Sequence, residues 1–322
     1  MRKILSGLLL AGCAVLAAPA VHAQAWPSKP VHLNVAFAPG GPVDIIARII
    51  QPKLTEYLGQ PMVIENRPGA GGIIASQALV QSAPDGYTLI LVASGHPLNQ
   101  FIYPSLPYET FKDFTAISEI ASSPLAVLVS KKSPYTNLQD LLAAARKNPD
   151  ALSYGMSGNG TSAHLAGELL KYMAGVKIVA VPYKGGAPAL TAVMAGDIPM
   201  SINPLAEVVG QIDGGQLRAV AVTSAQRSKT LPDVPTVAES GVAGYDVSVW
   251  WGFLGPARMA PEIVAKLEAD LKSALRDPNV LSTLEKIGAT PVGSGSKEFE
   301  AYMRAEATKW EPVLKAANIR AQ

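Results

Sequence analysis

Short apolar runs of strand-like character alternate along the chain with longer stretches in which apolar residues recur at helical spacing. Residues 42–58 and 71–83 are two of these helical stretches. Such alternation is typical of an α/β fold in which mainly parallel sheets are flanked by helices on both faces. The strand-like runs are residues 31–38, 61–66, 87–93, 124–130, 151–157, 177–183, 198–203 and 217–224.

The pattern changes towards the C-terminus. Residues 246–257 form another strand-like run, and helical segments follow at 261–276 and 297–317. We interpret this as a chain that enters a second lobe near Pro124 and returns to the first near Trp250. Two α/β lobes joined by two crossings form a cleft, where small ligands usually bind. The predicted parts are a signal peptide (1–25), a discontinuous lobe 1 (26–124 and 250–322) and lobe 2 (125–249).

Two short stretches make local predictions. Thr136 and Gln139 have the spacing of a capping box, which predicts that a helix begins there. Trp250 and Trp251 are adjacent in a strand-like run, so alternation turns one towards the core and the other towards the cleft or hinge. Core packing is the default for either ring.

The first 25 residues have the pattern of a secretory signal peptide. Arg2 and Lys3 precede an apolar run that ends in small residues, with cleavage sites before Gln24 and before Trp26. A competing interpretation is a bacterial lipobox at residues 10–13, in which Cys13 becomes a lipidated N-terminal residue. Both interpretations predict that the folded domain is exported.

Composition and charge limit the chemistry of the mature domain. Cys13 is the only cysteine, so disulfides, a thiolate nucleophile and cysteine metal sites are not expected. The formal net charge is +2, and removal of Arg2 and Lys3 leaves zero. Because a neutral surface binds nucleic acid poorly, any site for an anion must be built locally.

A glycine-rich turn joins the first predicted strand to the first predicted helix. Pro39, Gly40, Gly41 and Pro42 form this turn, and Asp44 follows in the first turn of the helix. Backbone N–H groups at the positive end of a helix bind anions, so this turn is a candidate for phosphate, dinucleotide or carboxylate. No Gly-Lys-Ser/Thr follows, which argues against a P-loop. An ordinary tight turn, with Asp44 placed by the helix dipole, is the alternative.

A second glycine turn has the same position in the second predicted lobe. Gly158 and Gly160 lie between a strand and a helix, and with Ala163 they formally fit a dinucleotide fingerprint. The next predicted strand ends without an Asp or Glu for a ribose hydroxyl, so this reading is not favoured. The turn still offers hydroxyls and N–H groups that can hold a carboxylate, although helix capping also explains Thr161 and Ser162.

Catalytic alternatives are weaker. The stretch around Ser157 misses the Gly-x-Ser-x-Gly nucleophile elbow because position 159 is Asn. His164 and Glu168 share a helix face, but a metal site needs more ligands than this pair. We therefore expect no metal and no cofactor, and we expect His164 to be packed or hydrogen-bonded. An exported serine hydrolase that uses Ser157 and His164 is kept as an alternative.

With these stretches assembled, the chain resembles the Bug-type extracytoplasmic solute receptors, the substrate-binding proteins of the tripartite tricarboxylate transporter class. The resemblance covers essentially the whole mature chain. The motifs that carry it are, in order, "WPSKPV", "FAPGGPVD", "ENRPGAGG", "APDGYTL", "SGNGTSAHLAGE", "VPYKGGAPAL", "LRAVAVTS", "LPDVPTVAESG" and "WWGFLGPA".

The resemblance implies a two-lobed periplasmic-binding-protein fold that closes around a small organic acid, without catalysis. It also implies a monomer in the periplasm that delivers its ligand to membrane permease subunits; a ligand sensor for a signalling partner is the alternative. The implied first-lobe contacts are Phe37, Ala38, Pro39, Gly40, Gly41, Asp44 and Ser94. The implied second-lobe contacts are Ser157, Asn159, Gly160, Thr161 and His164.

One position departs from the family pattern and is a further site candidate. Family members commonly read "FDN" where residues 202–204 read "INP", so Asn203 stands where an acidic residue is frequent. Asn can donate and accept but carries no charge. We therefore expect a plain carboxylic or aromatic acid in preference to an amino acid.

Overall fold

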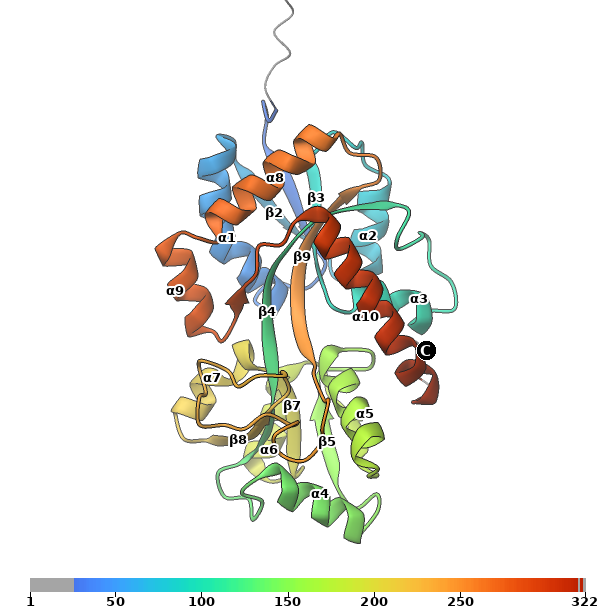
Figure 1. Ribbon diagram of the computed structural model, residues 1–322, viewed down its shortest axis with the longest axis vertical. Helices are drawn as coiled ribbons and strands as arrows, with labels where there is room; N and C mark the ends of the chain where they lie inside the picture. Colours follow the sequence, from blue (N-terminus) through green and yellow to red (C-terminus); the bar gives the residue numbers. More distant parts are fainter. Residues whose placement is uncertain (1–25, 318, 321–322) are drawn as a thin grey trace, which may run out of the picture.

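The computed structural model describes residues 26–317, 319 and 320. The predicted signal peptide and the lipobox cysteine Cys13 lie outside these residues. Within them, the chain forms two halves that follow one another along the long axis of the molecule (Figure 1). No helix in the described part of the chain combines the length and the apolar character needed to cross a membrane.

The strands of both halves belong to one hydrogen-bonded path. Its order is β2 (Met62–Asn66), β1 (Val31–Val35), β3 (Thr88–Ala93), β9 (Ser248–Pro256), β4 (Phe114–Ser130), β7 (Met200–Pro204), β5 (Ser153–Met156) and β6 (Val179–Pro182). β8 (Leu217–Val222) and β10 (Thr290–Pro291) pair with β4 off this path.

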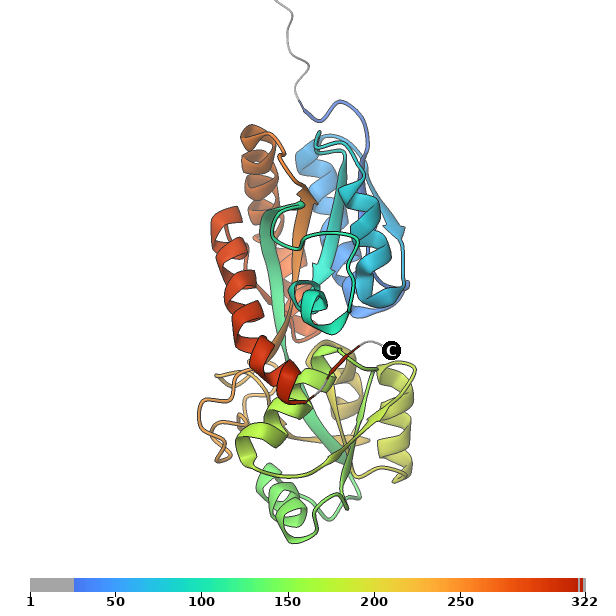
Figure 2. The same ribbon diagram turned by 90° about the vertical axis from the view of Figure 1, so that its right-hand side faces the viewer.

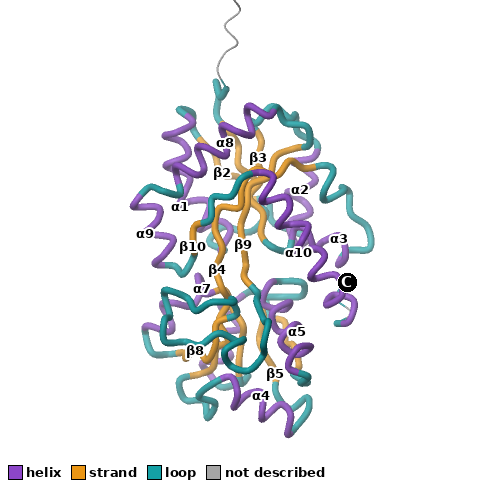
Figure 3. Tube along the Cα trace, in the orientation of Figure 1, coloured by secondary structure: helices purple, strands orange, loops and turns teal. Residues whose placement is uncertain are grey.

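The long strand β4 runs through both halves (Figure 3). Residues 114–124 pair with β9 in the first half, and residues 125–130 pair with β7 and β8 in the second. The sequence predicted only residues 124–130 as a strand. Ser118, Glu119 and Ser123 interrupt the apolar pattern before it, yet all three are buried against other parts of the first half.

The directions in which the strands pair determine where the loops at their ends lie. As predicted, β1 is parallel to β2 and β3, and β5 is parallel to β6 and β7. β4 and β9 pair antiparallel with their neighbours, so the sheet is mixed. Ala93, at the end of β3, pairs with Trp251 near the start of β9. Pro204, at the end of β7, pairs with Leu125. Both strand ends thus lie where β4 and β9 pass from one half to the other, which we call the crossing. The loops that follow these strand ends face each other.

Helices flank the sheet in both halves, as the α/β prediction requires. They are α1 (Pro42–Leu58), α2 (Ile73–Val80), α3 (Asn99–Ile102), α4 (Leu138–Lys147), α5 (Ser162–Ala174), α6 (Gly186–Ala195), α7 (Leu205–Asp213), α8 (Pro261–Ala274), α9 (Pro278–Lys286) and α10 (Ser296–Ala316), with short 3-10 turns η1 (Ala70–Gly72) and η2 (His96–Leu98).

The sequence placed the capping residues at the start of α4 one residue too early. Asn137 is the N-cap, and its side chain accepts a hydrogen bond from the N–H of Asp140. The Asp140 carboxylate in turn accepts from the N–H and the hydroxyl of Thr136. Asn137 and Asp140 take the roles assigned to Thr136 and Gln139 because Asn caps at least as well as Thr.

Trp250 and Trp251 point to opposite faces of β9, as alternation requires, but both are fully buried. The prediction that one of them faces the cleft or hinge is wrong. Helices cover both faces of the sheet at this point, and the Phe299 side chain of α10 packs edge-on against Trp250 at 5.3 Å between ring centroids. The default of core packing holds for both rings.

Helix α10 connects the two halves, in addition to the strands β4 and β9. It begins over β4 in the first half and reaches α5 in the second (Figure 2). Trp310 and Leu314, near its end, belong to the same buried cluster as Tyr154 and Leu165 of the second half. Any relative movement of the halves must therefore be accommodated by α10 as well as by β4 and β9.

The packing of α10 on β9 is testable at Gly252. A Cβ added there would overlap the Phe299 ring, so we predict that Gly252→Ala lowers the free energy of unfolding by about 1–3 kcal/mol in urea denaturation. Gly210→Ala in α7 is the control, because nothing lies within 4 Å of its added Cβ; it should leave stability unchanged or raise it by about 0.5–1 kcal/mol. Equal midpoints for the two variants would contradict this packing.

Candidate functional site

The first glycine turn connects β1 to α1. Gly40 adopts a positive φ of 77°, which reverses the chain before the helix, and Pro42 occupies the first helical position. The N-cap, Gly41, has no side chain to cap the helix. Within the described residues, the N–H groups of Val43 and Asp44 therefore find no acceptor in the protein. The turn leaves two N–H groups available at the positive end of α1.

The Asp44 carboxylate anchors this turn. Its Oδ2 accepts from the N–H of Gly40 at 2.9 Å and from Arg48 Nε at 2.8 Å, and its Oδ1 accepts from Asn66 Nδ2 at 2.9 Å. Asn66 also donates to the carbonyl of Phe37. Burial raises the pKa of Asp44, but these hydrogen bonds outweigh it and lower the pKa to about 2. Both carboxylate oxygens of this predicted contact are thus engaged inside the protein, and Arg48 is paired with it.

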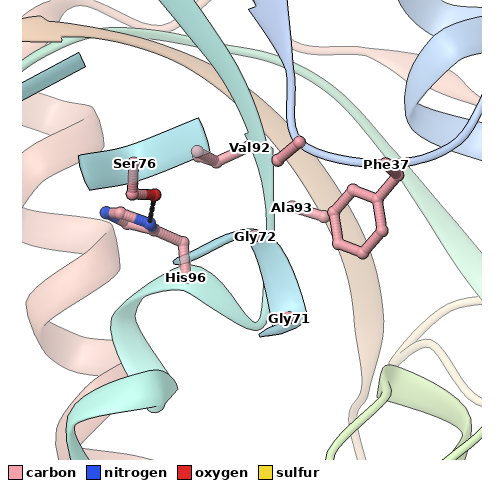
Figure 4. Close-up of a pocket in the computed structure, with 8 residues that line it drawn as sticks. Phe37, Gly71, Gly72, Ser76, Val92, Ala93 and His96 are labelled. Carbon is pink, nitrogen blue, oxygen red and sulfur yellow. Dashed lines mark hydrogen bonds between the residues drawn. The ribbon is translucent and has the colours of Figure 1, made fainter. Parts of the chain in front are cut away.

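A small pocket adjoins the turn. Its volume is about 10 Å³, which is room for one water molecule. Figure 4 shows the Phe37 ring on one side of it and Ser76 with His96 on the other. The lining also includes Gly71 and Gly72, which precede α2 and have positive φ values. These glycines were not among the predicted site residues, although "PGAGG" after a strand carries the same strand-to-helix signal as the first turn.

His96 contributes no charge to this region. Its ring is buried between Tyr108 and Phe114, and its Nδ1 lies 3.4 Å from the Ser76 hydroxyl. Burial lowers the pKa of His96 to about 4, so the imidazole is neutral near pH 7. The predicted contact Ser94 precedes it, buried directly after β3.

The second glycine turn connects β5 to α5 and repeats the arrangement of the first. Gly160, like Gly40, directly precedes the N-cap and has a positive φ, here 73°. Its N–H donates to His164 Nδ1 at 3.0 Å, just as Gly40 donates to Asp44, four residues on in each case. Thr161 is the N-cap and accepts from the N–H of His164.

His164 acts as a neutral anchor. Because Nδ1 accepts a hydrogen bond, the ring proton lies on Nε2, 3.8 Å from Glu168 Oε1. The hydrogen bonds to this carboxylate come from Lys171 and Tyr154. Burial lowers the pKa of His164. The expectation of a hydrogen-bonded His164 is confirmed, and within the described residues no hydrogen bond joins it to Ser157, as a serine hydrolase would require.

The second turn also keeps N–H groups available. In the described part of the chain, those of Ser162 and Ala163 have no acceptor. The Thr161 hydroxyl donates to the carbonyl of Gly158 at 2.8 Å, so its hydrogen is engaged. Ser157 is half-buried and Asn159 is exposed.

Asn203 lies at the end of β7 and is fully buried. Its Nδ2 lies 3.4 Å from Glu207 Oε2, and among the described residues its Oδ1 has no partner. Sequence reasoning missed Glu207, which belongs to α7. The only signal was its position four residues after Asn203, a spacing that brings side chains together only once the strand end and the helix have formed.

The predicted residues thus occupy two facing groups of loops. In the first half, Phe37, Ala38, Pro39, Gly40, Gly41 and Asp44 follow β1 and Ser94 follows β3; in the second, Ser157, Asn159, Gly160, Thr161 and His164 follow β5 and Asn203 is the last residue but one of β7. Phe37 to Gly40 are exposed. The halves approach each other at Gly160, where an added Cβ would lie 3.3 Å from Ile102 Cδ1 of α3.

Charged groups are scarce in these loops. Neither glycine turn contains a Lys or Arg, and the nearby Arg48 is paired with Asp44. Among the residues that the structure describes, no group of three His, Cys, Asp or Glu side chains is placed to hold a metal ion. An anion bound here would rely on backbone N–H groups, hydroxyls and helix ends.

Comparison with known proteins gives a consistent result. Residues 46–319 match the model of the tripartite tricarboxylate transporter family receptor. BugT of Bordetella pertussis is 34% identical over 95% of this chain and 94% of its own.

Two solved structures with named ligands are also similar. Rpa4515 of R. palustris with adipate is 38% identical, covers 92% of this chain and 99% of its own, and gives a TM-score of 0.84. MatC from Rhodopseudomonas palustris with bound malate is 32% identical, covers 89% of this chain and 99% of its own, and gives a TM-score of 0.79.

The anchoring role of Asp44 makes a pH-dependent prediction. Because the folded-state pKa lies near 2, below the usual 3.8, ionised Asp44 stabilises the fold fully above about pH 4, and this contribution is lost as pH falls towards 2. Asp44→Asn should lower the free energy of unfolding by about 2 kcal/mol at pH 7. This difference from the wild type should shrink as the pH falls below about 4.

Urea denaturation between pH 7 and pH 3 measures this gap. Glu56→Gln, on the exposed surface of the same helix, is the control and should stay within about 0.5 kcal/mol of the wild type. A gap that is absent at pH 7, or that is unchanged at pH 3, would show that Asp44 does not anchor the turn.

Proposed function

The chain belongs to the family of receptors for tripartite tricarboxylate transporters, which are periplasmic solute-binding proteins, and from this premise we propose that it captures a small carboxylate-bearing organic acid between its two halves. We further propose that it works in the periplasm and presents this acid to the membrane subunits of such a transporter.

One observation carries the proposal: two helices begin at facing glycine turns with N–H groups that lack acceptors among the described residues. These groups belong to Val43 and Asp44 of α1 and to Ser162 and Ala163 of α5. A carboxylate between them would accept charge-assisted hydrogen bonds from both helix ends. The binding of adipate and malate by similar proteins agrees with an acid ligand.

The predicted site residues then divide into two roles. Those that offer backbone, amide or hydroxyl groups would contact the acid, and those with engaged side chains would hold the turns in place. The side chains of Asp44 and His164 belong to the second class, because each accepts from the glycine N–H four residues before it. Besides the N–H groups of Val43, Asp44, Ser162 and Ala163, the proposed contacts are Phe37, Ala38, Pro39, Gly40, Gly41, Ser94, Ser157, Asn159, Gly160 and Thr161.

The proposed movement is closure of the two halves about the crossing. Pro124 and Ser248 pair there, which supports lobe boundaries close to the predicted residues 124 and 250. Closure would remove water from around the carboxylate and thereby strengthen its interactions with the N–H groups. Because α10 also spans the halves, we expect a small rotation instead of a wide opening.

A pair of glycines at the two ends of α1 tests the site. Gly40 and Gly59 both have positive φ, and nothing lies within 4 Å of a Cβ added to either. Gly40→Ala strains the first turn and displaces its N–H groups, so we predict at least a tenfold loss of affinity for the acid. Gly59→Ala strains the distant C-cap in the same way and should keep the wild-type affinity.

The acid is first found by thermal shift with a panel of dicarboxylic, monocarboxylic and aromatic acids that includes malate and adipate, because a ligand of the native state raises the melting temperature. Calorimetry with the strongest acid then compares the variants. Equal affinities for Gly40→Ala and Gly59→Ala would contradict the proposed site. A complete lack of shift across dicarboxylic, monocarboxylic and aromatic acids would contradict the proposed ligand class.

A further inference from the structure

Two polar side chains of the second half meet the start of helix α6. Asn203 Nδ2 lies 3.4 Å from Glu207 Oε2, and a Cβ added to Gly186 would overlap both groups. Gly186 is the first residue of α6, and its N-cap, Gly185, provides no side-chain cap. The absence of a side chain at position 186 therefore lets a carboxylate of the same half lie against this helix N-terminus.

Neither side chain is fully paired: Asn203 has an acceptor without a donor, and Glu207 has no cationic partner in the described residues. Asn203 is fully buried, and within the described residues its Oδ1 has no hydrogen-bond partner. Glu207 is half-buried, and in the same residues no Lys, Arg or His nitrogen lies within 4 Å of its carboxylate. Burial raises the pKa of Glu207, with a smaller opposing effect from the Asn203 hydrogen bond. A buried acceptor without a donor and a partly buried carboxylate without a cationic partner are both costly, which favours a donor from outside.

The position of this pair relates it to the proposed acid site. Asn203 pairs with Ala126 of β4, one step from the crossing, so it lies at the same end of the second half as the turn before α5. The Glu207 carboxylate lies beside Gly186 at the start of α6, where its charge disfavours a second carboxylate. A ligand carboxylate is thus directed to α1 and α5, and the α6 end suits a group that donates.

We propose that Glu207 accepts a hydrogen bond from a hydroxyl or ammonium group on the bound acid, with Asn203 as the residue that positions its carboxylate. This inference rests on the proposed function and narrows its substrate class to hydroxy- or amino-substituted acids. It reverses the expectation of a plain acid, which took Asn203 as the loss of an acidic group. The acidic side chain comes instead from Glu207 of α7, one helical turn further along the chain.

Succinate, malate and aspartate test the inference because they differ only by H, OH or NH₃⁺ on one carbon. Calorimetry on the full mature chain should give malate or aspartate at least tenfold tighter binding than succinate. Glu207→Ala should abolish this preference while succinate binding changes by less than about threefold. Glu207→Gln, which keeps an acceptor but no charge, should retain a preference for malate and lose one for aspartate.

Controls separate the two proposals. Glu239→Gln, which removes an exposed carboxylate paired with Arg227, should leave all affinities unchanged. If the chain binds adipate instead, 2-hydroxyadipate and 2-aminoadipate replace the C4 acids. Plain acids that bind as tightly as the substituted ones, or a preference that survives Glu207→Ala, would overturn the inference alone. Failure of every acid to bind would overturn the proposed function with it.

Discussion

A hydrogen bond from a glycine N–H to a side chain four residues later shapes the turn before each of α1 and α5. We call the two helix starts that these turns form the mouths of the candidate site. In the first half, Gly40 donates to Asp44, and in the second, Gly160 donates to His164. Each bond satisfies the N–H just before the N-cap and fixes the turn that leads into the helix. The N–H groups of the first helical turn then remain directed outward. The positions of the proposed ligand contacts in these two turns depend on the two bonds.

The two anchors differ in charge, and the difference has a physical reason. Asp44 is ionised, and Arg48 and Asn66 neutralise and solvate it. His164 accepts with a neutral ring, and its other nitrogen faces Glu168, which is itself paired with Lys171. Neither anchor adds net charge to the mouth. A bound anion would therefore meet helix ends without a competing fixed charge from the anchors.

Magnitudes favour a proposed site that uses both helix starts. A helix N-terminus stabilises an anion by about 0.3–2 kcal/mol, and a hydrogen bond to a charged group contributes about 1.5–3 kcal/mol. Micromolar binding needs about 8 kcal/mol after the cost of association. Two helix starts offer twice as many such hydrogen bonds as one, so binding between them is stronger than binding at either alone. In the proposed arrangement, closure of the halves therefore increases affinity.

The sequence predicted the elements well because most of them have clear periodicity. The strands at 61–66 and 87–93 and the helix at 42–58 match β2, β3 and α1 to within a residue. The failures arise where tertiary contacts decide. Polar residues of β4 are buried against distant segments, and Trp251 is covered by packed helices on its own face.

The candidate site could be located from the sequence, but the roles within it could not. Glycine turns between strands and helices pointed to both loops. Spacing alone did not reveal that both carboxylate oxygens of Asp44 are hydrogen-bonded, because Asn66 approaches this helical residue from β2. Glu207 was missed for a similar reason, since its contact with Gly186 joins two elements that are separate in sequence.

A crystal structure of the mature chain with the acid that binds most tightly in the thermal-shift panel tests the central claim most directly. We predict one carboxylate whose oxygens lie about 3 Å from backbone nitrogens at the starts of both α1 and α5, with no Lys or Arg side chain in contact. A carboxylate held by a basic side chain, or bound at only one of the two helix starts, would contradict it.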